Sequence, residues 1–512
     1  MFLFLILILF VFLYIFNYMM VFHIIYCDII FIKCKISPHQ AIIKTKGETI
    51  MQFDLFGDKK LYIHFVGIGG ISMSGIAHIL LKRGHRISGS DRSVSPITDK
   101  LKAEGAEFYH GHSQEHVKNP DLVVYTSAVD ENNPELEAAR KKGIQTVDRA
   151  DMLGQLMRHY EYSVAVAGAH GKTTTTSMTS LIIENSGLDP TLLIGGELEQ
   201  IGGNVKVGAN RYLVTEACEY KENFLKFYPH IAVILNIDKD HLDYFRDLDH
   251  IKSAFEKFAN LAPEHGWVVA CRDDPVLMEI VSNLTCNVIT FGLNGDARIN
   301  ARNLSFDDKG CPAFDLYDGS SFLQRIQLAI PGRHNVLNAL AAVSTALILG
   351  IDTDTIRTTL ETFSGTHRRF EIKGKYGGAT VVDDYAHHPA EIRATLAAAR
   401  NYPHNKTWCV FQPHTYTRTK FLFEDFAGSF NDADRVIITD IYAAREKDTG
   451  EVRSAHLAEE ISKRGQNAVY MAGFGNIARY LSENLKDGDL LLTIGAGDVY
   501  RIGEILLEED FG

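Results

Sequence analysis

The sequence predicts an α/β protein of three domains with mostly parallel sheets. Repeatedly along the chain, a short apolar run ends in a glycine-rich or polar turn and precedes a segment with helical spacing of apolar residues. This order is typical of βα units, whose strands pair in parallel. A length of 512 residues suits about three domains of ordinary size. We expect an apolar leader over residues 1–50, followed by domains over residues 51–160, 161–363 and 364–512.

The composition limits the partners of the protein. The net charge is −12, and the sequence has no dense basic run, which argues against broad nucleic-acid binding. The seven cysteines form no CxxC pair, and reduced thiols in the cytoplasm are therefore expected. We predict a cytoplasmic protein that binds no nucleic acid; the composition says nothing about its oligomeric state.

The leader has two interpretations. Residues 2–26 are almost all apolar or aromatic, and such a run is long enough to span a bilayer. Lysines follow from Lys33 onward, so that a real span would leave the body of the protein in the cytoplasm. The alternative is a start codon assigned too early, with Met51 as the true first residue. A membrane contact is expected only in the first case.

The first domain is predicted to be Rossmann-like. A strand over Leu61–Val66 leads into a glycine turn and a helix over Ser72–Arg83, and a second strand over Ile87–Ser90 ends in an aspartate. This is the order of a dinucleotide-type βαβ unit, although the third glycine of GxGxxG is absent. An NAD-binding domain is therefore an alternative to a site for another diphosphate. The candidate binding residues here are Gly67, Gly69, Gly70, Ser72, Asp91 and Ser127, the last just beyond an expected strand.

The second domain opens with VAVAGAHGKTTTTS, residues 164–177. The apolar residues predict a buried strand, the glycines a turn, and the residues from Lys172 onward a helix. Backbone N–H groups and a lysine at a helix N-terminus suit a phosphate, and a threonine hydroxyl suits Mg²⁺. The full eight-residue P-loop pattern is not present, because its first glycine would fall at Val166. A plain glycine turn is the alternative.

Two more strands of this domain end in polar residues. The strand that ends at Thr215 precedes Glu216, and the strand expected over Ile231–Ile237 precedes a segment containing His241. Ligands gather at the carboxyl ends of parallel strands, so we expect Lys172, Glu216 and His241 to converge near a triphosphate. Glu216 and His241 are candidate Mg²⁺ ligands, directly or through water. The alternatives are a structural carboxylate and a packed helix-start histidine.

Polar residues also mark the end of the second domain. Asn335 and Asn338 stand one helical turn apart before an alanine-rich segment, where they offer a donor and an acceptor to a purine edge or cap the helix. Arg369 stands at the next junction, where it meets a phosphate when domains come together or lies in a surface turn.

The third domain repeats the α/β pattern and is predicted to be Rossmann-like. Apolar runs lead into the polar segments DDYAHHP, PHTYTRT and GAGD. Polar clusters just beyond strands are typical of a binding face. His387 and His388 have no partner histidine at a metal-ligand spacing, and for that reason a zinc site is not expected.

Together these motifs resemble the ATP-dependent Mur ligase family, from Met51 to the end of the chain. They are GIGGISMSGIA from Gly67, GAHGKTTTT from Gly168, EACEYKENFLKFYP from Glu216, NIDKDHLDYF from Asn236, GRHNVLNALAA from Gly332, HRRFE from His367, DDYAHHP from Asp383, FQPHTYTRT from Phe411 and GAGD from Gly495. The resemblance implies a first domain that holds a UDP-sugar, a P-loop-type ATPase in the middle and a last domain that carries the amino acid.

The resemblance also implies roles for single residues. ATP would meet Gly168, Ala169, His170, Gly171, Lys172, Thr173 and Thr174 through its phosphates, Asn335 and Asn338 through adenine, and Arg369. Mg²⁺ would meet Thr173, Glu216 and His241. The amino acid would meet Tyr385, His388 and Arg418, and the catalytic set would be Lys172, Glu216, His241 and Arg418.

The alanine-adding branch of the family fits best, which implies UDP-N-acetylmuramate and L-alanine as substrates in peptidoglycan precursor synthesis. Glu256 stands where related ligases have a carbamylated lysine, and Thr415 stands where many relatives have arginine. Three alternatives remain: a ligase that adds a ready-made peptide to the same UDP-sugar, a membrane-tethered dehydrogenase, and a binding module without activity.

Overall fold

The computed structural model describes residues 54–126 and 128–508, and these residues form three β-sheets of five, ten and six strands. Most strand pairs in the three sheets are parallel, which confirms the predicted α/β class. Each sheet falls within one predicted domain, and the limits of those domains stay predictions. Within the described part of the chain, no helix combines the length and apolar character that a membrane span needs. The predicted leader and Ser127 lie outside the described residues.

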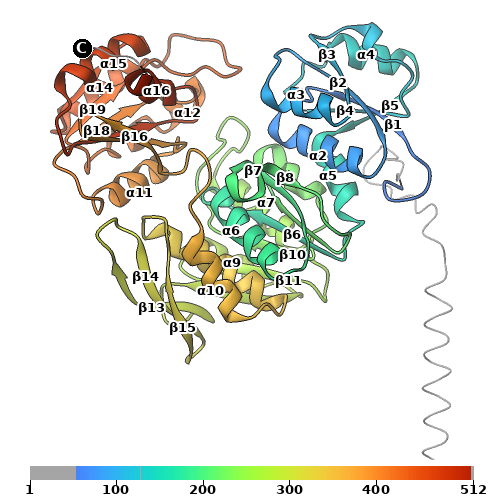
Figure 1. Ribbon diagram of the computed structural model, residues 1–512, viewed down its shortest axis with the longest axis horizontal. Helices are drawn as coiled ribbons and strands as arrows, with labels where there is room; N and C mark the ends of the chain where they lie inside the picture. The colour runs from blue at the N-terminus through green and yellow to red at the C-terminus, as the bar shows by residue number, and fades with distance from the viewer. Residues whose placement is uncertain (1–53, 127, 509–512) are drawn as a thin grey trace, which may run out of the picture. The chain divides into compact units, whose positions relative to one another are not determined.

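The first sheet has the strand order β3-β2-β1-β4-β5, with every pair parallel. Strands β2 and β3 lie on one side of β1, and β4 and β5 lie on the other. The crevice at the carboxyl end of β1 is therefore a topological switch point, where ligands bind in such sheets. The glycine turn at residues 67–70 lies there, because it joins β1 to α2, and Figure 1 labels both elements. Its elements are β1 (Tyr62–Val66), α2 (Ile71–Lys82), β2 (Arg86–Asp91), α3 (Pro96–Ala103), β3 (Glu107–His110), β4 (Leu122–Tyr125), α4 (Pro134–Lys141), β5 (Gln145–Asp148) and α5 (Arg149–Met157).

The second sheet has the order β15-β14-β13-β12-β11-β10-β6-β9-β7-β8. Strand β6 lies between β9 and β10, and all three run parallel. Antiparallel pairs occur at both ends of the sheet. The strands are β6 (Tyr162–Ala167), β7 (Thr191–Leu198), β8 (Gly203–Lys206), β9 (Tyr212–Glu216), β10 (Ile231–Ile234), β11 (Trp267–Cys271), β12 (Asn287–Gly292), β13 (Ile299–Phe306), β14 (Pro312–Asp318) and β15 (Ser321–Gln327).

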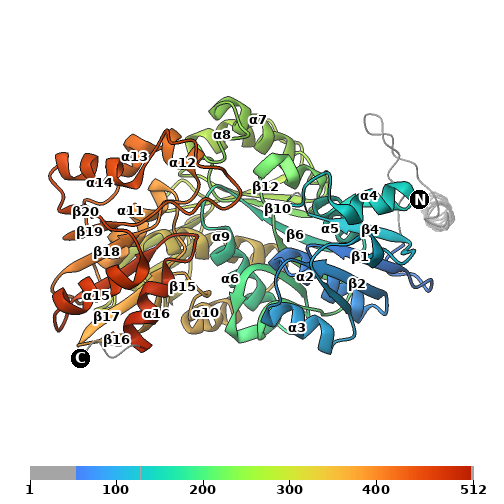
Figure 2. The same ribbon diagram turned by 90° about the horizontal axis from the view of Figure 1, so that it is seen from above.

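The helices of this second segment are α6 (Lys172–Asn185), α7 (Leu248–Ala259), α8 (Pro275–Val281), α9 (His334–Ile348) and α10 (Thr353–Thr362). Helix α6 is buried from Thr173 to Ile183 and packs against α9 and α10 (Figure 2). Because so much of α6 is covered, its N-terminus and the phosphate loop before it are held at a fixed place beside β9 and β10.

Strand β10 ends at Ile234, three residues before the end that the apolar pattern predicts. The reason lies in Asn236, whose side chain leaves the sheet to bond the phosphate loop. Its Oδ1 accepts the N–H of His170 at 2.9 Å, and its Nδ2 donates to the carbonyl oxygen of His170 at 3.1 Å. The loop after β10 is therefore fastened to the loop after β6.

The third sheet has the order β16-β17-β21-β18-β19-β20, antiparallel only between β16 and β17. Alternate residues face two cores: Val382 packs with α11, α13 and α14, and Val381 packs with α15 and α16. Its elements are β16 (Glu371–Tyr376), β17 (Ala379–Asp384), α11 (Pro389–Ala399), β18 (Thr407–Phe411), α12 (Tyr416–Phe421), α13 (Phe423–Ala427), β19 (Arg435–Ile438), α14 (Ser454–Lys463), β20 (Ala468–Tyr470), α15 (Phe474–Asn484), β21 (Leu490–Ile494) and α16 (Tyr500–Glu508).

Candidate active site

The phosphate loop connects β6 to α6 through two glycines with positive φ, Gly168 at 143° and Gly171 at 83°. Gly171 is the N-cap of α6, and no side chain caps this helix end. A Cβ at Gly171 would lie 2.5 Å from Asn338 Oδ1, which only glycine avoids. An uncapped N-terminus of a buried helix presents its first N–H groups and its positive end to an anion.

Lys172 is the first residue of α6, and its ammonium group is surrounded by oxygen. It donates to the carbonyl oxygens of Gly168 and Ala169 and to both carboxylate oxygens of Glu219, at 3.2 and 3.1 Å. Burial alone would lower the pKa of Lys172, but the charge of Glu219 outweighs burial and holds this pKa above its usual range. The lysine is therefore a fixed positive charge at the helix end.

The predicted convergence at the strand ends is present in the structure. Lys172, Thr173, Glu216 and His241 line one cavity of about 390 Å³, between the carboxyl ends of β6, β9 and β10. Glu216 accepts the N–H of Gly195 from β7 at 2.7 Å, so a neighbouring strand orients its carboxylate. The side chains that the sequence predicts as phosphate and Mg²⁺ contacts thus line the same cavity.

His241 does not start a helix, which removes one alternative for it. Its backbone has φ of 54°, and its ring packs on Tyr220 with 4.7 Å between the ring centroids. Burial would lower the pKa of His241, and the charge of Asp240 is the largest influence raising it above the ordinary value.

Two acidic residues that the sequence analysis did not select complete this region. Ligand atoms of Glu219, Asp240 and His241 lie within 4.8 Å of one another, an arrangement that can hold a metal ion. Glu219 is almost fully buried, and so is Asp240. Their positions in the sequence could have indicated both residues, because Glu219 follows β9 closely and Asp240 directly precedes His241. Glu256, by contrast, lies in α7 and is not among the described residues that line the cavity.

A second cavity of about 600 Å³ lies beside the phosphate loop, with His170, Asn335, Asn338 and Arg369 in its wall. No side chain caps α9, so capping by the asparagines is not observed. Asn335 donates to the carbonyl oxygen of Pro331 at 2.7 Å, and its Oδ1 accepts from Asn338 at 3.0 Å. The paired amides form a polar strip in a largely apolar cavity, which suits a flat heteroaromatic ring.

Arg418 of α12 reaches across to the segment after β10. Its guanidinium donates to Asp240 Oδ1 at 3.1 and 2.9 Å, and these residues line a third cavity of about 410 Å³ together with His241. Burial would raise the pKa of Asp240, but His241 and Arg418 hold it well below the usual range. Thr415 has φ of 65° and accepts the N–H of Arg418 at 3.4 Å, so it caps the helix that carries the arginine.

Two more residues of the third domain face the second one. Tyr385 lines the 390 Å³ cavity, with the guanidinium of Arg369 5.2 Å from its ring centroid. His388 begins α11 and lies 3.0 Å, through Nε2, from the carbonyl oxygen of Lys239. Arg369 ends a turn that its N–H closes on the carbonyl oxygen of Thr366 at 3.0 Å, and it lines both the 390 Å³ cavity and the 600 Å³ cavity.

The glycine turn of the first domain borders a cavity of about 790 Å³ at the switch point. Gly67, Gly70, Ser72 and Asp91 line it, with Arg149 also in the wall. Arg149 donates to Ser72 Oγ at 3.0 Å. Asp91 accepts the N–H of Gly69 at 2.9 Å, so this carboxylate holds the glycine turn in shape. Ser127, the remaining candidate here, lies outside the described residues.

Known proteins and family models match most of the chain. Models of the Mur ligase family catalytic domain, the Mur ligase middle domain and the Mur ligase glutamate ligase domain match residues 62–161, 166–346 and 368–497. A UDP-N-acetylmuramate–L-alanine ligase from Caldanaerobacter subterraneus is 54% identical over 460 residues, 90% of this chain and 100% of its own. The ligase of that name from Acetivibrio thermocellus is 55% identical over 453 residues, 88% and 97% of the two chains.

Solved structures resemble the fold as well. The UDP-N-acetylmuramate–alanine ligase from Thermotoga maritima superimposes with a TM-score of 0.75 at 30% identity, covering 88% of this chain and 98% of its own. A murein peptide ligase from Psychrobacter arcticus reaches a TM-score of 0.67 at 24% identity, covering 87% and 98% of the two chains, and this likeness is one of fold alone.

Proposed function

The chain belongs to the Mur ligase family, and from that premise we propose that it joins L-alanine to the lactyl carboxylate of UDP-N-acetylmuramate, with cleavage of ATP to ADP and phosphate. The observation that carries the proposal is the single cavity shared by Lys172, Thr173, Glu216 and His241. Relatives with this activity in their names are more than half identical to the chain along nearly their full length. The reaction belongs to peptidoglycan precursor synthesis, and we propose the cytoplasm as its location.

The family uses ATP, and the phosphate loop fits a nucleotide. The uncapped end of α6 and the ammonium of Lys172 suit the phosphates, and a side chain at Gly171 would fill the space beside Asn338. The 600 Å³ cavity next to the loop suits adenine, with Asn335 and Asn338 at its polar strip and Arg369 toward the phosphates. Gly168, Ala169, His170, Thr173 and Thr174 are the remaining proposed contacts.

Mg²⁺ fits the oxygen-rich side of the cavity. We assign it to Thr173, Glu216 and His241, with Glu219 and Asp240 close to His241. Hydroxyl and carboxylate oxygens are the ligands that Mg²⁺ prefers. When bound, Mg²⁺ neutralises charge on the transferring phosphoryl group.

The two other substrates suit two further cavities. The UDP-sugar suits the 790 Å³ cavity, where the glycine turn lets the backbone approach a diphosphate and Arg149 supplies positive charge. L-Alanine suits the 410 Å³ cavity, where Arg418 is a partner for its carboxylate and Asp240 for its ammonium group. Tyr385, which lines the 390 Å³ cavity, and His388, which lies 3.0 Å from the carbonyl oxygen of Lys239, are further proposed contacts of L-alanine.

The chemistry needs activation of a carboxylate before the amide forms. An oxygen of the lactyl carboxylate attacks the γ-phosphorus, the bond from that phosphorus to the bridging oxygen breaks, and ADP leaves. The ammonium group of L-alanine first gives up a proton to solvent, and the resulting amine attacks the acyl carbon. Phosphate then leaves, and the nitrogen gives up a second proton as the amide forms. Lys172 and the N–H groups of α6 offset the repulsion between carboxylate and phosphoryl oxygens, which is the main task in phosphoryl transfer.

The test is phosphate release in the presence of UDP-N-acetylmuramate, ATP, Mg²⁺ and L-alanine. We expect release only when all four are present, with one UDP-N-acetylmuramoyl-alanine formed per phosphate. The same assay with a tripeptide in place of L-alanine separates this function from that of a peptide ligase. Release that is supported by the tripeptide and not by L-alanine would overturn the proposal.

A further inference from the structure

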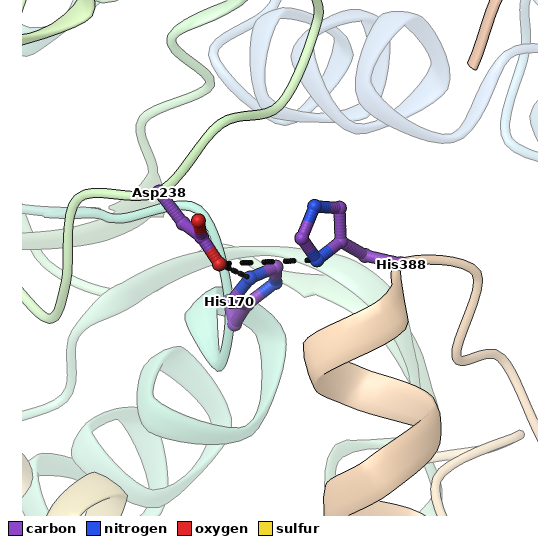
Figure 3. A group of neighbouring side chains, drawn as sticks. All are labelled: His170, Asp238 and His388. Atoms are coloured by element: carbon purple, nitrogen blue, oxygen red, sulfur yellow. Dashed lines mark hydrogen bonds and ion pairs between the residues drawn. The ribbon is translucent and has the colours of Figure 1, made fainter. Parts of the chain in front are cut away.

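Three side chains outside the proposed Mg²⁺ site meet at the junction between the second and third domains. Figure 3 shows His170 of the phosphate loop, Asp238 of the segment after β10, and His388 at the start of α11 pointing toward one another. Asp238 Oδ2 lies 3.1 Å from His170 Nε2 and 3.9 Å from His388 Nδ1. All three ligand atoms lie within 4.8 Å of one another.

We propose that His170, Asp238 and His388 form a binding site for a divalent cation of the Zn²⁺ class, separate from the Mg²⁺ site. Zinc bonds of about 2.0–2.2 Å in tetrahedral geometry hold two ligand atoms roughly 3.4 Å apart. The distances of 3.1 and 3.9 Å bracket that value. Small side-chain rotations therefore bring the three atoms to ligand positions, and water takes the remaining place.

The contacts of the second ring nitrogen in each histidine, the one that would not bind the cation, support this assignment. Metal-bound histidines usually give their other ring nitrogen to a carboxylate or a backbone carbonyl, which fixes the tautomer. His170 Nδ1 lies 3.4 Å from Glu391 Oε1, and His388 Nε2 lies 3.0 Å from the carbonyl oxygen of Lys239. His388 Nδ1 accepts the N–H of Ala390 at 3.3 Å, so this nitrogen carries no proton, and a cation would replace Ala390 as the partner of its lone pair.

The ligand set selects the kind of cation. Two imidazole nitrogens and one carboxylate suit Zn²⁺, Co²⁺ or Ni²⁺, whereas Mg²⁺ prefers oxygen. The cluster of Glu219, Asp240 and His241 is richer in oxygen and is the better Mg²⁺ site. The sequence did not predict a zinc site because these ligands come from three distant segments, and His387 and His388 have no partner histidine at a short spacing.

The position of the site gives the cation a structural effect. His170 and Asp238 belong to the second domain, and His388 belongs to the first turn of the third domain's α11. A bound cation would tie the phosphate loop to α11 and oppose their separation. This inference concerns metal binding and holds whether or not the ligase reaction proceeds as proposed.

Untagged full-length protein is titrated with Co²⁺ in excess Mg²⁺, which saturates the oxygen-rich cluster, and visible absorption reports Co²⁺ in a nitrogen-containing site. Competition between Zn²⁺ and bound Co²⁺ then gives the affinity of the site for Zn²⁺. We expect one equivalent of Co²⁺ to bind, and His388→Ala or Asp238→Asn to lower the affinity about 100-fold or more. Glu391→Gln should lower it by about 10–100-fold, the usual cost of losing an outer partner of a histidine ligand.

The neighbouring His387 gives a matched control, because it is also a histidine in the same segment and is not part of the group. His387→Gln should bind Co²⁺ like the parent protein. No absorption at one equivalent, or unchanged affinity in both His388→Ala and Asp238→Asn, would overturn the proposal. Loss of the signal in His241→Gln would also overturn it, because the cation would then lie in the Mg²⁺ region. Circular dichroism confirms that each variant is folded.

Discussion

Lys172 and the buried Glu219 form an ion pair in which the lysine Nζ lies 3.2 and 3.1 Å from the two carboxylate oxygens. The same ammonium group donates to the carbonyl oxygens of Gly168 and Ala169 in the phosphate loop. The pair therefore joins the loop after β6 to the segment after β9. A phosphate oxygen that approaches Lys172 must share the ammonium with these partners or replace them, which makes the pair part of nucleotide binding.

Replacing Lys172 by alanine should lower turnover by about 100-fold or more, the scale for removing a preorganised charge from a transition state. The measurement is the rate of ATP-dependent ligation at saturating substrates. Lys257→Ala is a control of the same charge, because Lys257 is exposed and pairs with Glu222 at the surface. Near-normal ligation by Lys172→Ala would refute the role of this lysine.

Replacing Glu219 by alanine should destabilise the protein by about 3–5 kcal/mol, because it leaves the buried ammonium of Lys172 unpaired. The check is the thermal midpoint by calorimetry. The double variant Lys172→Met with Glu219→Gln removes both charges, and we expect it to recover part of the lost stability. If the double variant is less stable than the sum of the two single changes implies, the pair is not the cause.

Gly171 should be intolerant of a side chain for two reasons that can be separated. Its φ is 83°, and a Cβ there would lie 2.5 Å from Asn338 Oδ1. Gly187 has φ of 80° with nothing within 4 Å of a Cβ, so Gly187→Ala carries the backbone strain without the clash. We expect both alanine variants to lose about 1 kcal/mol from the strain, and only Gly171→Ala to raise the KM for ATP. Equal KM values would remove Asn338 from the nucleotide site.

Much of this fold could be predicted from local sequence. Apolar runs such as Leu122–Tyr125 and Leu490–Ile494 coincide with strands β4 and β21, because strands buried on both faces read as continuous apolar segments. The convergence of Lys172, Glu216 and His241 followed from a general property of parallel sheets, whose carboxyl ends share one edge. Neither inference needed knowledge of distant contacts.

What the sequence did not predict depends on contacts between segments far apart in the chain. Glu219 reads as one acidic residue among several until Lys172 is seen beside it. Glu391 reads as a first-turn helix residue, yet it lies 3.4 Å from His170 of another domain. The shorter β10 has the same origin, because Asn236 leaves the sheet to bond the phosphate loop. Only tertiary structure selects these partners.

Arg418 should set the affinity for L-alanine. Its guanidinium already binds a carboxylate, Asp240, through two N–H groups, and a lysine cannot reproduce that fork. We expect Arg418→Lys to raise the KM for L-alanine about tenfold, the scale of one charge-assisted hydrogen bond, and to change the KM for ATP much less. Arg400→Lys, an exposed arginine that pairs with Asp432, is the control. Equal changes in both KM values would indicate a general loss of structure.

A buried carboxylate in the first domain should make stability depend on acid pH. Glu135 is fully buried, and Ser90, His112 and His116 lie within hydrogen-bonding distance of its oxygens, with His64 at 3.4 Å. Burial would raise the pKa of Glu135, but the nearby His64 and the hydrogen-bonding contacts with Ser90 and His112 outweigh burial and lower it from 4.5 to about 2. The ionised form is thus favoured in the folded protein.

The sign of the effect follows from that lowered pKa. Glu135 contributes its stabilisation above pH 4.5, where the unfolded chain is also ionised, and loses it as the pH falls toward 2. The full contribution is about 3 kcal/mol from a shift of this size. Glu135→Gln should therefore melt below the parent protein at pH 6, and calorimetry should show the difference narrowing below pH 4.5. A difference that stays constant down to pH 3 would mean that the variant loses packing and that the charge of Glu135 contributes nothing.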